Sequence, residues 1–499
     1  MPEIVLSHVT KRWDKFYAVD DLNLVIEDNA FVTLLGPSGC GKTTTLRMIA
    51  GLETPTSGRI TIGDRVVFDS EKGINIPANK RKVGFLFQNY ALWPNMTVYK
   101  NIAFGLTNIK DELPRIDFEA KKAAQLIEVL KRPDETVRII KECIDKKGKL
   151  DTNKAHIKLI DRFEISMFSA KTVMGWKLHE SLEPCTVAAA RLAECEKTLE
   201  SARAKCAAEG CVFNDDFAYV KDGKVLTSVR KLTAEEIDLT VRRVARIVKI
   251  GMFMDRYPSE LSGGQQQRVA IARTLAPEPT VLFMDEPLSN LDAKLRLEMR
   301  SELQRLHIDT GSTFIYVTHD QTEAMTMGSR IVVMKDGFMQ QQDTPQNLYD
   351  YPANLFVACF IGTPQMNIFR VRLEKRGDAV YASFGNNSIK VPAGKVQRMT
   401  GDYIGKEVYM GIRPENIHDE SAFISAYPDA CIDVSVELIE LMGSETYLYL
   451  STTGKDENFI ARVDPRTTSR GGDHIKVGFD VNRLHFFDVE TEKTILSRD

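Results

Sequence analysis

The chain has 499 residues, of which 43% are hydrophobic and 27% are charged, and its formal net charge is -3. At roughly 100 to 200 residues per domain, this length predicts two to four folding units. The balanced charge offers no general polyanion-binding surface, so we expect no nucleic acid partner. The N-terminal residues lack the pattern of an export signal, and no stretch approaches the about 18 consecutive apolar residues of a spanning helix. Eight scattered cysteines favour reduced thiols over a disulfide framework.

The first recognisable unit is an apolar strand, FVTLLG, followed by a glycine-rich turn and the helical pattern TTTLRMIAGLE. β-branched or apolar runs recur farther along the chain and alternate with helical patterns such as LDAKLRLEMRSELQRLH. These runs lie at 83–88, 280–285, 313–318 and 330–334. Strands that alternate with helices predict a parallel α/β sheet.

Residues Gly36 to Thr43, GPSGCGKT, fit the phosphate-loop pattern in the strand–turn–helix context that this motif requires. The glycines allow backbone N–H groups to converge on phosphate oxygens, and the helix N-terminus adds its positive end. Lys42 supplies a point charge, and the hydroxyl of Thr43 is suited to Mg²⁺. We therefore predict a nucleotide-binding loop here.

Two further segments carry groups suited to phosphate chemistry. TVLFMDEP places Asp285 and Glu286 at the carboxyl end of a strand, where open α/β sheets bind ligands. LSGGQ, with Ser262, precedes the helical QQRVAIARTLA, which predicts a second anion-binding helix N-terminus. Taken singly, the acid pair can cap a turn and Ser-Gly-Gly can be an ordinary helix entry. Together with the phosphate loop, they indicate one nucleotide site.

In this order, the motifs resemble those of the ATP-binding-cassette (ABC) family: a Walker A loop, the LSGGQ signature and a Walker B strand. Gln88 in FQNYALWP is similar to the family's Q-loop, Ser289 to Asp292 to its D-loop, His319 in VTHD to its H-loop, and Trp13 to the aromatic that stacks on adenine. The family implies a head-to-tail dimer in which the LSGGQ loop of one subunit covers the γ-phosphate held by the other.

The resemblance assigns roles to residues of this sequence. It implies that the catalytic residues are Glu286, His319, Gln88 and Lys42. It implies that the Mg²⁺ ligands are Thr43, Gln88 and Asp285. It implies ATP contacts from Trp13, Gly36, Ser38, Gly39, Cys40, Gly41, Lys42, Thr43, Thr44, Ser262, Gly263, Gly264, Gln265 and Asp292.

The C-terminal third strengthens the resemblance to importer ATPases of the maltose, glycerol-phosphate and multiple-sugar type, through strings such as YPANLFVACFIGTPQMN, GIRPENI and ELMGSETYLYL. That group implies import of a solute, most simply a carbohydrate, with two membrane permease subunits and a solute-binding protein as partners. It also implies a cytoplasmic location on the inner face of the membrane. Polyamine importers share the ATPase motifs and are the alternative.

The predicted fold is therefore an α/β P-loop NTPase of the ABC type followed by an all-β domain. We assign 1–109 and 232–364 to the ATPase domain, whose helical subdomain lies near 89–275, and 365–499 to an OB-like (TOBE) regulatory domain. In CIDVSVEL, period two predicts that Ile432, Val434, Val436 and Leu438 share one face of a strand.

Residues 110–231 have no counterpart in the family pattern, and we predict that they form an α+β region inserted in the helical subdomain. Because the family docks its permeases near this subdomain, the insert puts the docking mode in doubt, but it leaves the nucleotide chemistry unaffected. IDFEAKKAAQLI at 116–127 matches IDLTVRRVARIV at 237–248 position by position, and only the second copy leads into LSGGQ. Apolar residues spaced three and four apart from Cys185 to Cys206 predict a helix that ends at Gly210. FAYVKDGKVLTSV predicts a hairpin around Asp222-Gly223.

Four insert cysteines, at 185, 195, 206 and 211, leave a metal site as an alternative to core packing. Three lie on the apolar stripe and none forms a C-x-x-C pair, so we expect packing.

Two other functions compete with transport. In DNA-repair ATPases the cassette is also interrupted by an inserted segment. The apolar stripe from Cys185 to Cys206 is, however, too short for the long coiled-coil arms of that class. A nucleotide-binding regulator without turnover conflicts with the presence of Lys42, Asp285, Glu286 and His319.

Overall fold

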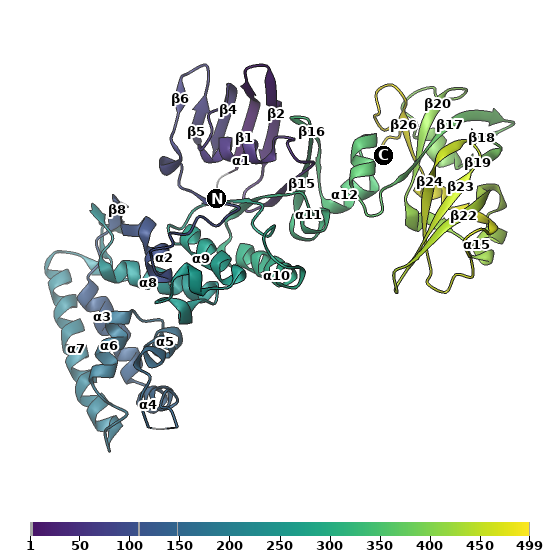
Figure 1. Cartoon of the computed structure of the whole chain (residues 1–499). Coiled ribbons are helices and arrows are strands. Elements are labelled where there is room, and N and C mark those ends of the chain that lie inside the picture. Colours follow the sequence, from purple (N-terminus) through teal and green to yellow (C-terminus); the bar gives the residue numbers. More distant parts are fainter. Residues whose placement is uncertain (1–2, 108–109, 147, 499) are drawn as a thin grey trace. The chain divides into compact units, whose positions relative to one another are not determined.

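The computed structural model describes residues 3–107, 110–146 and 148–498, and the chain forms two compact units. The first unit comprises Met1–Pro77 and Thr313–Asp499, and the second comprises Ala78–Ser312. Figure 1 labels many of their helices and strands. Across the described ranges, no helix is both long and apolar enough to cross a membrane.

The first unit begins with an antiparallel sheet that carries the N-terminal residues. Its strands lie in the order β2-β1-β4-β5-β6. Alternate residues of β1 and β2 are buried, as expected for a sheet with one face against the core. Their bounds are Ile4–Trp13 for β1, Phe16–Ile26 for β2, Ser57–Ile62 for β4, Arg65–Asp69 for β5 and Ile74–Asn75 for β6.

A second set of strands in this unit carries the phosphate loop. Strand β3 (Phe31–Leu35) pairs in parallel with β14 (Thr313–Thr318) on one side and with β15 (Arg330–Lys335) on the other, and β16 (Phe338–Asp343) adds antiparallel to β15. All residues of β3 and β14 are buried, which explains their continuous apolar runs. The associated helices are α1 (Lys42–Ala50), α11 (Gln321–Met327), α12 (Pro345–Asp350) and α13 (Leu355–Phe360).

The C-terminal part of the first unit contains two antiparallel sheets that share one apolar core. One sheet has the order β19-β18-β17-β20-β26, with bounds Asn387–Val391, Ala379–Phe384, Asn367–Arg376, Glu407–Ile412 and His485–Asp488. The other has the order β21-β25-β22-β23-β24, with bounds Ile417–His418, His474–Phe479, Cys431–Leu441, Thr446–Thr452 and Lys455–Val463. Helices α14 (Ala393–Gln397) and α15 (Ser421–Ala426) are short.

Strand β22 corrects one prediction. Ile432, Val434 and Val436 are buried as period two predicts, but Leu438 is 52% exposed. The register with β23 shifts between Val436 and Leu438. Such a bulge turns the following side chains to the other face of the strand, so the alternation stops there.

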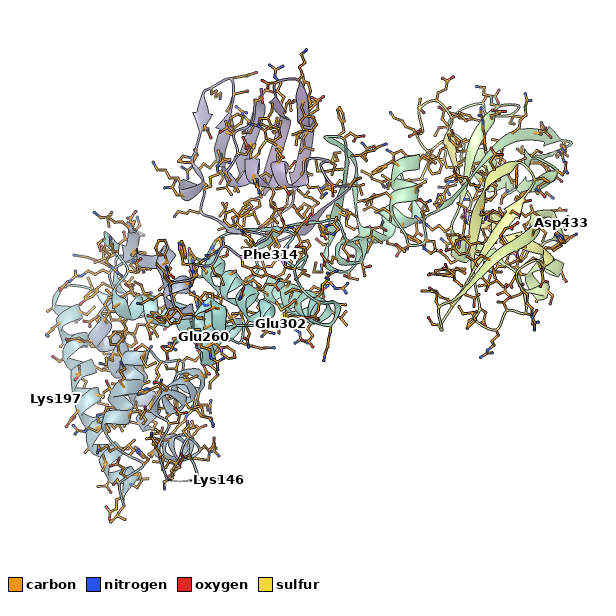
Figure 2. All side chains as sticks on the ribbon, viewed as in Figure 1. Lys146, Lys197, Glu260, Glu302, Phe314 and Asp433 are labelled. Carbon is orange, nitrogen blue, oxygen red and sulfur yellow. The ribbon has the colours of Figure 1, made fainter. Side chains whose placement is uncertain are left out.

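The second unit contains the parallel pair β7 (Val83–Leu86) and β13 (Val281–Asp285) and a set of helices. These are α2 (Val98–Thr107), α8 (Ala234–Ile247), α9 (Gly263–Leu275) and α10 (Ala293–Thr310). On α10, Glu302, labelled in Figure 2, accepts a hydrogen bond of 2.8 Å from Arg268 of α9. The side chains thus tie the helix that follows LSGGQ to its neighbour.

The predicted insert is a helical bundle with small strands (Figure 1). Strands β8 (Lys110–Pro114) and β12 (Thr227–Lys231) pair antiparallel, so the two ends of the insert lie side by side. Between them lie α3 (Phe118–Leu130), α4 (Pro133–Lys141), α5 (Thr152–Phe163), α6 (Met167–Gly175), α7 (Pro184–Ala208), β9 (Val212–Phe213), β10 (Tyr219–Lys221) and β11 (Lys224–Val225).

The predicted stripe helix and hairpin are confirmed as α7 and as β10–β11, where Val220 pairs with Val225. Cys206 and Cys211 are buried in a cluster with Tyr219, whereas Cys185 is exposed. Helix α7 packs against α3.

Candidate functional site

The phosphate loop, Gly36 to Thr43, joins buried strand β3 to helix α1, and it requires glycine at two crowded positions. A Cβ added at Gly36 would lie 2.2 Å from the carbonyl oxygen of Met334. At Gly41, where φ is 99°, a Cβ would lie 2.3 Å from the carbonyl oxygen of Ala18. Gly39 also has positive φ, at 80°, but faces open space. Close backbone approach, as well as turn geometry, therefore determines the glycine spacing.

Lys42 holds the loop in its curled shape. Its Nζ donates to the carbonyl oxygens of Gly36, at 2.7 Å, and Pro37, at 2.8 Å. The Cys40 thiol lies 3.6 Å from the same Nζ, and burial raises the pKa of that thiol. The ammonium group therefore lies inside the loop, where positive charge is needed to bind a phosphate.

His319 follows directly after β14, the strand that pairs in parallel with β3. Because Thr318 is in register with Leu35, His319 and Gly36 leave the sheet at the same edge. His319 is exposed, and Asp320 accepts the hydrogen bond that caps α11. The histidine predicted for the H-loop thus lies at the edge that carries the phosphate loop.

Trp13 ends strand β1 as an exposed aromatic surface. Its ring is 46% exposed and stacks in parallel on Phe16, with ring centroids 6.4 Å apart. The ammonium of Lys11 lies 5.3 Å from the ring centroid. An indole in this setting can accept a planar base, since it is supported on one side and open to solvent.

In the second unit, the acid pair and Gln88 meet where β13 and β7 end. These strands are parallel neighbours, so residues that follow them lie at one edge. Asp285 is only 4% exposed, whereas Glu286 is half-buried. The Gln88 amide donates to the Glu286 carboxylate at 3.3 Å and to the Ser289 hydroxyl at 3.4 Å.

Glu286 has an unusual backbone conformation, with φ of 43°. The Ser289 hydroxyl donates to its carbonyl oxygen at 2.9 Å and holds the turn. Asn290 then donates to the carbonyl oxygen of Gln88 at 3.1 Å. A left-handed conformation at a non-glycine residue costs energy, so the surrounding contacts must maintain the direction of this carboxylate.

The signature segment forms the N-terminal end of helix α9. Ser262 and Gln265 form a capping box in which each side chain accepts from the other's backbone N–H. A Cβ added at Gly264 would lie 2.6 Å from Leu295 on α10, so the second glycine allows the two helices to pack closely. Asp292 caps α10 by accepting from the backbone N–H of Leu295 at 3.0 Å.

Two positioning residues have no motif that could have identified them. Arg273 of α9 donates to the backbone carbonyl oxygens of Tyr90 and Ala91, which follow Gln88. Asn101 is fully buried and exchanges hydrogen bonds with the backbone of Trp93. Both residues hold the segment after Gln88 by hydrogen bonds to its backbone atoms. Because such bonds do not depend on the side chains of that segment, the only sequence signal is a polar residue within a helical pattern.

The comparisons with known proteins cover both units. The ABC transporter family matches residues 19–174 and 180–289. The MalK OB fold domain matches 362–417, and the TOBE domain matches 410–487. A solved dimeric bacterial ABC transporter cassette is 22% identical, with 68% of this chain and 98% of that chain covered and a TM-score of 0.40.

Similarity to curated relatives extends along the whole chain. It is 36% identical over 498 residues to an oligosaccharides import ATP-binding protein of Bacillus subtilis, covering 99% of this chain and 100% of the relative. A trehalose/maltose import ATP-binding protein of Thermococcus litoralis is 35% identical with the same coverage. An osmoprotective compounds uptake ATP-binding protein of Synechocystis is 35% identical over 496 residues, covering 99% and 100%. The chain therefore belongs to the ABC transporter family, as an ATP-binding and ATP-hydrolysing importer subunit with C-terminal OB and TOBE domains.

Proposed function

We propose that the chain hydrolyses ATP to energise carbohydrate import, with Glu286 as the group that activates water. The observation that carries the catalytic part is the hydrogen bond between Gln88 and Glu286 at the ends of two parallel strands. A carboxylate that is half-buried and held by an amide is suited to orient or deprotonate a water molecule. The neighbouring Asp285 is more deeply buried and suited to a charge-stabilising role.

The proposed ATP contacts come from the phosphate loop and from Trp13. Loop N–H groups and Lys42 bind the phosphates, while the exposed indole stacks on adenine. The remaining loop contacts are Gly36, Ser38, Gly39, Cys40, Gly41, Thr43 and Thr44. His319 completes the catalytic set, since it leaves the sheet beside the loop.

The proposed Mg²⁺ ligands are Thr43, Gln88 and Asp285. A hydroxyl, an amide and a carboxylate oxygen are hard donors of the kind that Mg²⁺ prefers, so the residues fit the ion. When bound with ATP, Mg²⁺ would neutralise charge on the phosphates.

The proposed assembly is a homodimer of ATPase subunits with two membrane permeases and a solute-binding protein, on the cytoplasmic face of the membrane. In the dimer, Ser262, Gly263, Gly264, Gln265 and Asp292 would contribute to the partner's ATP site. The position of these residues at the N-terminal end of α9 supports this, because the positive end of the helix dipole attracts anions. We propose 1–109 and 232–364 as the ATPase domain, 110–231 as the insert and 365–499 as the regulatory domain.

Carbohydrate as the solute class rests on the full-length similarity to the Bacillus and Thermococcus proteins, whose names specify oligosaccharides and trehalose/maltose. Because of the similarity to the Synechocystis protein, osmoprotective compounds are the second candidate for the solute class. A DNA-repair role receives no support, since the OB and TOBE matches belong with transport relatives.

The insert contributes to a groove that we propose as part of the permease contact. This groove, about 790 Å³, is lined by α2 and α8 and by insert helices α5 and α6. Phe104 of α2 is 38% exposed, and Phe168 of α6 is 47% exposed. Exposed aromatic side chains around a groove fit a helical segment of a partner, so the insert would enlarge the docking surface.

The test of the catalytic proposal is Glu286→Gln in the purified chain. We expect ATP binding to persist and turnover to fall by about 10²- to 10⁴-fold, the range for loss of a general base. The measurements are steady-state phosphate release and binding of a fluorescent ATP analogue. Glu196→Gln, the same change on the exposed face of α7, should leave both unchanged. Wild-type turnover in Glu286→Gln would remove Glu286 from the proposed role.

The test of the transport proposal is purification of the tagged chain from detergent-solubilised membranes. Co-purification of two multispanning subunits and a sugar-binding protein would support it, and only soluble partners or DNA would contradict it.

A further inference from the structure

A separate cavity of about 390 Å³ lies in the first unit, where helix α12 and the residues after it meet the C-terminal strands. Its volume falls within the range of about 300 to 1,000 Å³ that is typical of small-molecule sites. Five cationic side chains and two carboxylates line it. The cavity therefore has an excess of positive charge, although the chain as a whole is slightly acidic.

Within the described ranges of the chain, two of the cations form no ion pair with a carboxylate within 4.0 Å. The Nζ of Lys395 donates to the carbonyl oxygen of Leu484 at 2.7 Å. The guanidinium of Arg398 donates to the carbonyl oxygen of Ser497, at 3.0 Å from Nε. A carbonyl satisfies a donor but carries no net charge, so both positive charges persist in the cavity.

Arg413 forms the cavity wall and is only 2% exposed. It donates to the carbonyl oxygens of Ile361 and Tyr349, and its guanidinium carbon lies 3.6 Å from the Tyr349 ring centroid. Its Nε has no hydrogen-bond partner in the described structure. An unpaired donor on a buried guanidinium is costly unless a ligand or water satisfies it.

The other charged groups offset the excess only in part. Arg483 lies 3.8 Å from Asp350, and Arg498 lies 2.7 Å from Asp343. Glu415, the second lining carboxylate, accepts a hydrogen bond from the hydroxyl of Tyr349. After the two ion pairs, Lys395, Arg398 and Arg413 lie in the cavity with the carboxylate of Glu415, and Asp480 also acts on Lys395. These carboxylates reduce the excess of positive charge but do not remove it.

We propose that this cavity binds a small phosphorylated molecule through Lys395, Arg398 and Arg413. A phosphate monoester carries about -1.5 to -2 charges and three acceptor oxygens, which match clustered ammonium and guanidinium donors. The cavity is larger than inorganic phosphate needs, and side-chain amides of Asn416 and Asn482 line it as well. Those amides suit the hydroxyl groups of a phosphorylated polyol or sugar.

The charge state of Lys395 depends on the groups around it. Burial is the main cause that lowers its pKa from 10.5 to about 8, and repulsion from Arg398 adds to it. A bound phosphate would favour the charged ammonium and reverse this shift.

The experiment is isothermal titration calorimetry on the full chain, with the phosphate loop saturated by a non-hydrolysable ATP analogue and Mg²⁺. Glucose 6-phosphate, inorganic phosphate and glucose are the probes. We expect one saturable site per chain for glucose 6-phosphate and none for glucose. If inorganic phosphate binds equally well, phosphate itself is the ligand, which also supports the site.

The variant K395Q/R398Q should weaken binding by about tenfold or more, which is about 1.4 kcal/mol. R483Q removes a cation of the cavity whose side chain is 60% exposed, so we expect this substitution to disturb folding little. It should weaken binding as well. The control K375Q/R466Q makes the same charge change at exposed positions outside the cavity. Equal affinity in wild type and both cavity variants, or no saturable phosphate binding at millimolar concentration, would overturn the proposal. Neither result depends on ATP turnover, so this test stands apart from that of Glu286.

Discussion

At the residue scale, the phosphate loop contains two glycines with positive φ in different surroundings. Gly39 has φ of 80° and faces open space, whereas Gly41 has φ of 99°, and a Cβ there would lie 2.3 Å from the Ala18 carbonyl oxygen. An alanine at Gly39 would meet only the conformational cost, of about 1 to 2 kcal/mol. An alanine at Gly41 would add a clash with backbone that cannot move as a side chain can.

We therefore expect Gly41→Ala to lose nucleotide binding and thermal stability more severely than Gly39→Ala. The measurements are the dissociation constant for a fluorescent ATP analogue and the midpoint of thermal unfolding. The matched pair separates the two effects, because both variants carry the same methyl group. Equal losses in the two variants would show that the Ala18 contact has no influence.

Lys395 predicts a dependence of stability on pH. Its folded pKa, about 8, lies below the ordinary value of 10.5, and the charged groups around it are Arg398, Asp480 and Arg483. Below pH 8 the folded chain carries the full cost of the buried ammonium. Between about pH 8 and 10.5 the unfolded chain holds more protons at this site, so stability rises with pH.

The measurement is the free energy of unfolding of wild type minus that of Lys395→Gln, from denaturant titrations at several pH values. We expect this difference to increase as pH rises through 8. Phosphate binding should weaken over the same interval, since the ammonium is lost. A difference that stays constant with pH would mean that Lys395 titrates as an ordinary exposed lysine.

At the element scale, the repeated segments 116–127 and 237–248 show how one pattern takes two roles. Asp117 accepts from the Ala120 N–H and caps α3. Its counterpart Asp238 lies inside α8, is buried, and accepts from the Met167 N–H at 2.6 Å. The second copy has an earlier capping box at Thr233, so its helix starts before the aspartate.

Asp238 links α8 to the insert and pairs with Arg242 at 3.4 Å, where the two side chains are 4% and 10% exposed. We expect Asp238→Ala to destabilise the chain by about 3 kcal/mol, because it leaves a buried guanidinium unpaired. Asp238→Asn keeps an acceptor for Met167 and should cost less. Urea unfolding measures both, and similar losses in the two variants would mean that the charge of Asp238 contributes little.

At the scale of the whole molecule, the insert begins and ends on one antiparallel pair, β8 and β12, in which Pro114 faces Thr227. An insertion with adjacent ends costs the host little, because the ends do not pull its elements apart. None of the residues in the proposed ATP site belongs to 110–231.

We predict that replacing residues 115–226 by Asn-Gly, which joins Pro114 to Thr227 in a two-residue hairpin, preserves ATP hydrolysis. The thermal midpoint should fall, since α8 loses contacts such as that of Asp238 with Met167. Steady-state ATPase activity and co-purification of permeases are the measurements. A folded deletion variant that no longer binds nucleotide would show that the insert is integral to the site.

The motifs and the strand pattern could be predicted because they depend on local chemistry. The loop glycines and Lys42 lie close in sequence because they turn one segment around a phosphate. Strands β13 and β14 are buried on both faces, which requires apolar runs, and the acid pair lies at the end of the first of these runs. Arg273 could not be predicted, because it acts on backbone atoms of a segment 182 and 183 residues away. Asn101 could not be predicted, because its partners are backbone atoms of a turn whose shape the residue types do not specify. Leu438 was misplaced because a bulge depends on the partner strand.

The sequence by itself determined the family, and it predicted a nucleotide site and an insert, since these follow from residue types at fixed spacing. The tertiary structure decided which groups meet: Gln88 with Glu286, Gly264 with Leu295, and Lys395 with the carbonyl oxygen of Leu484 in the cationic cavity. The physical reason is that such contacts join segments far apart in the chain. Their distances and burial are properties of the packed fold, and no local pattern specifies them.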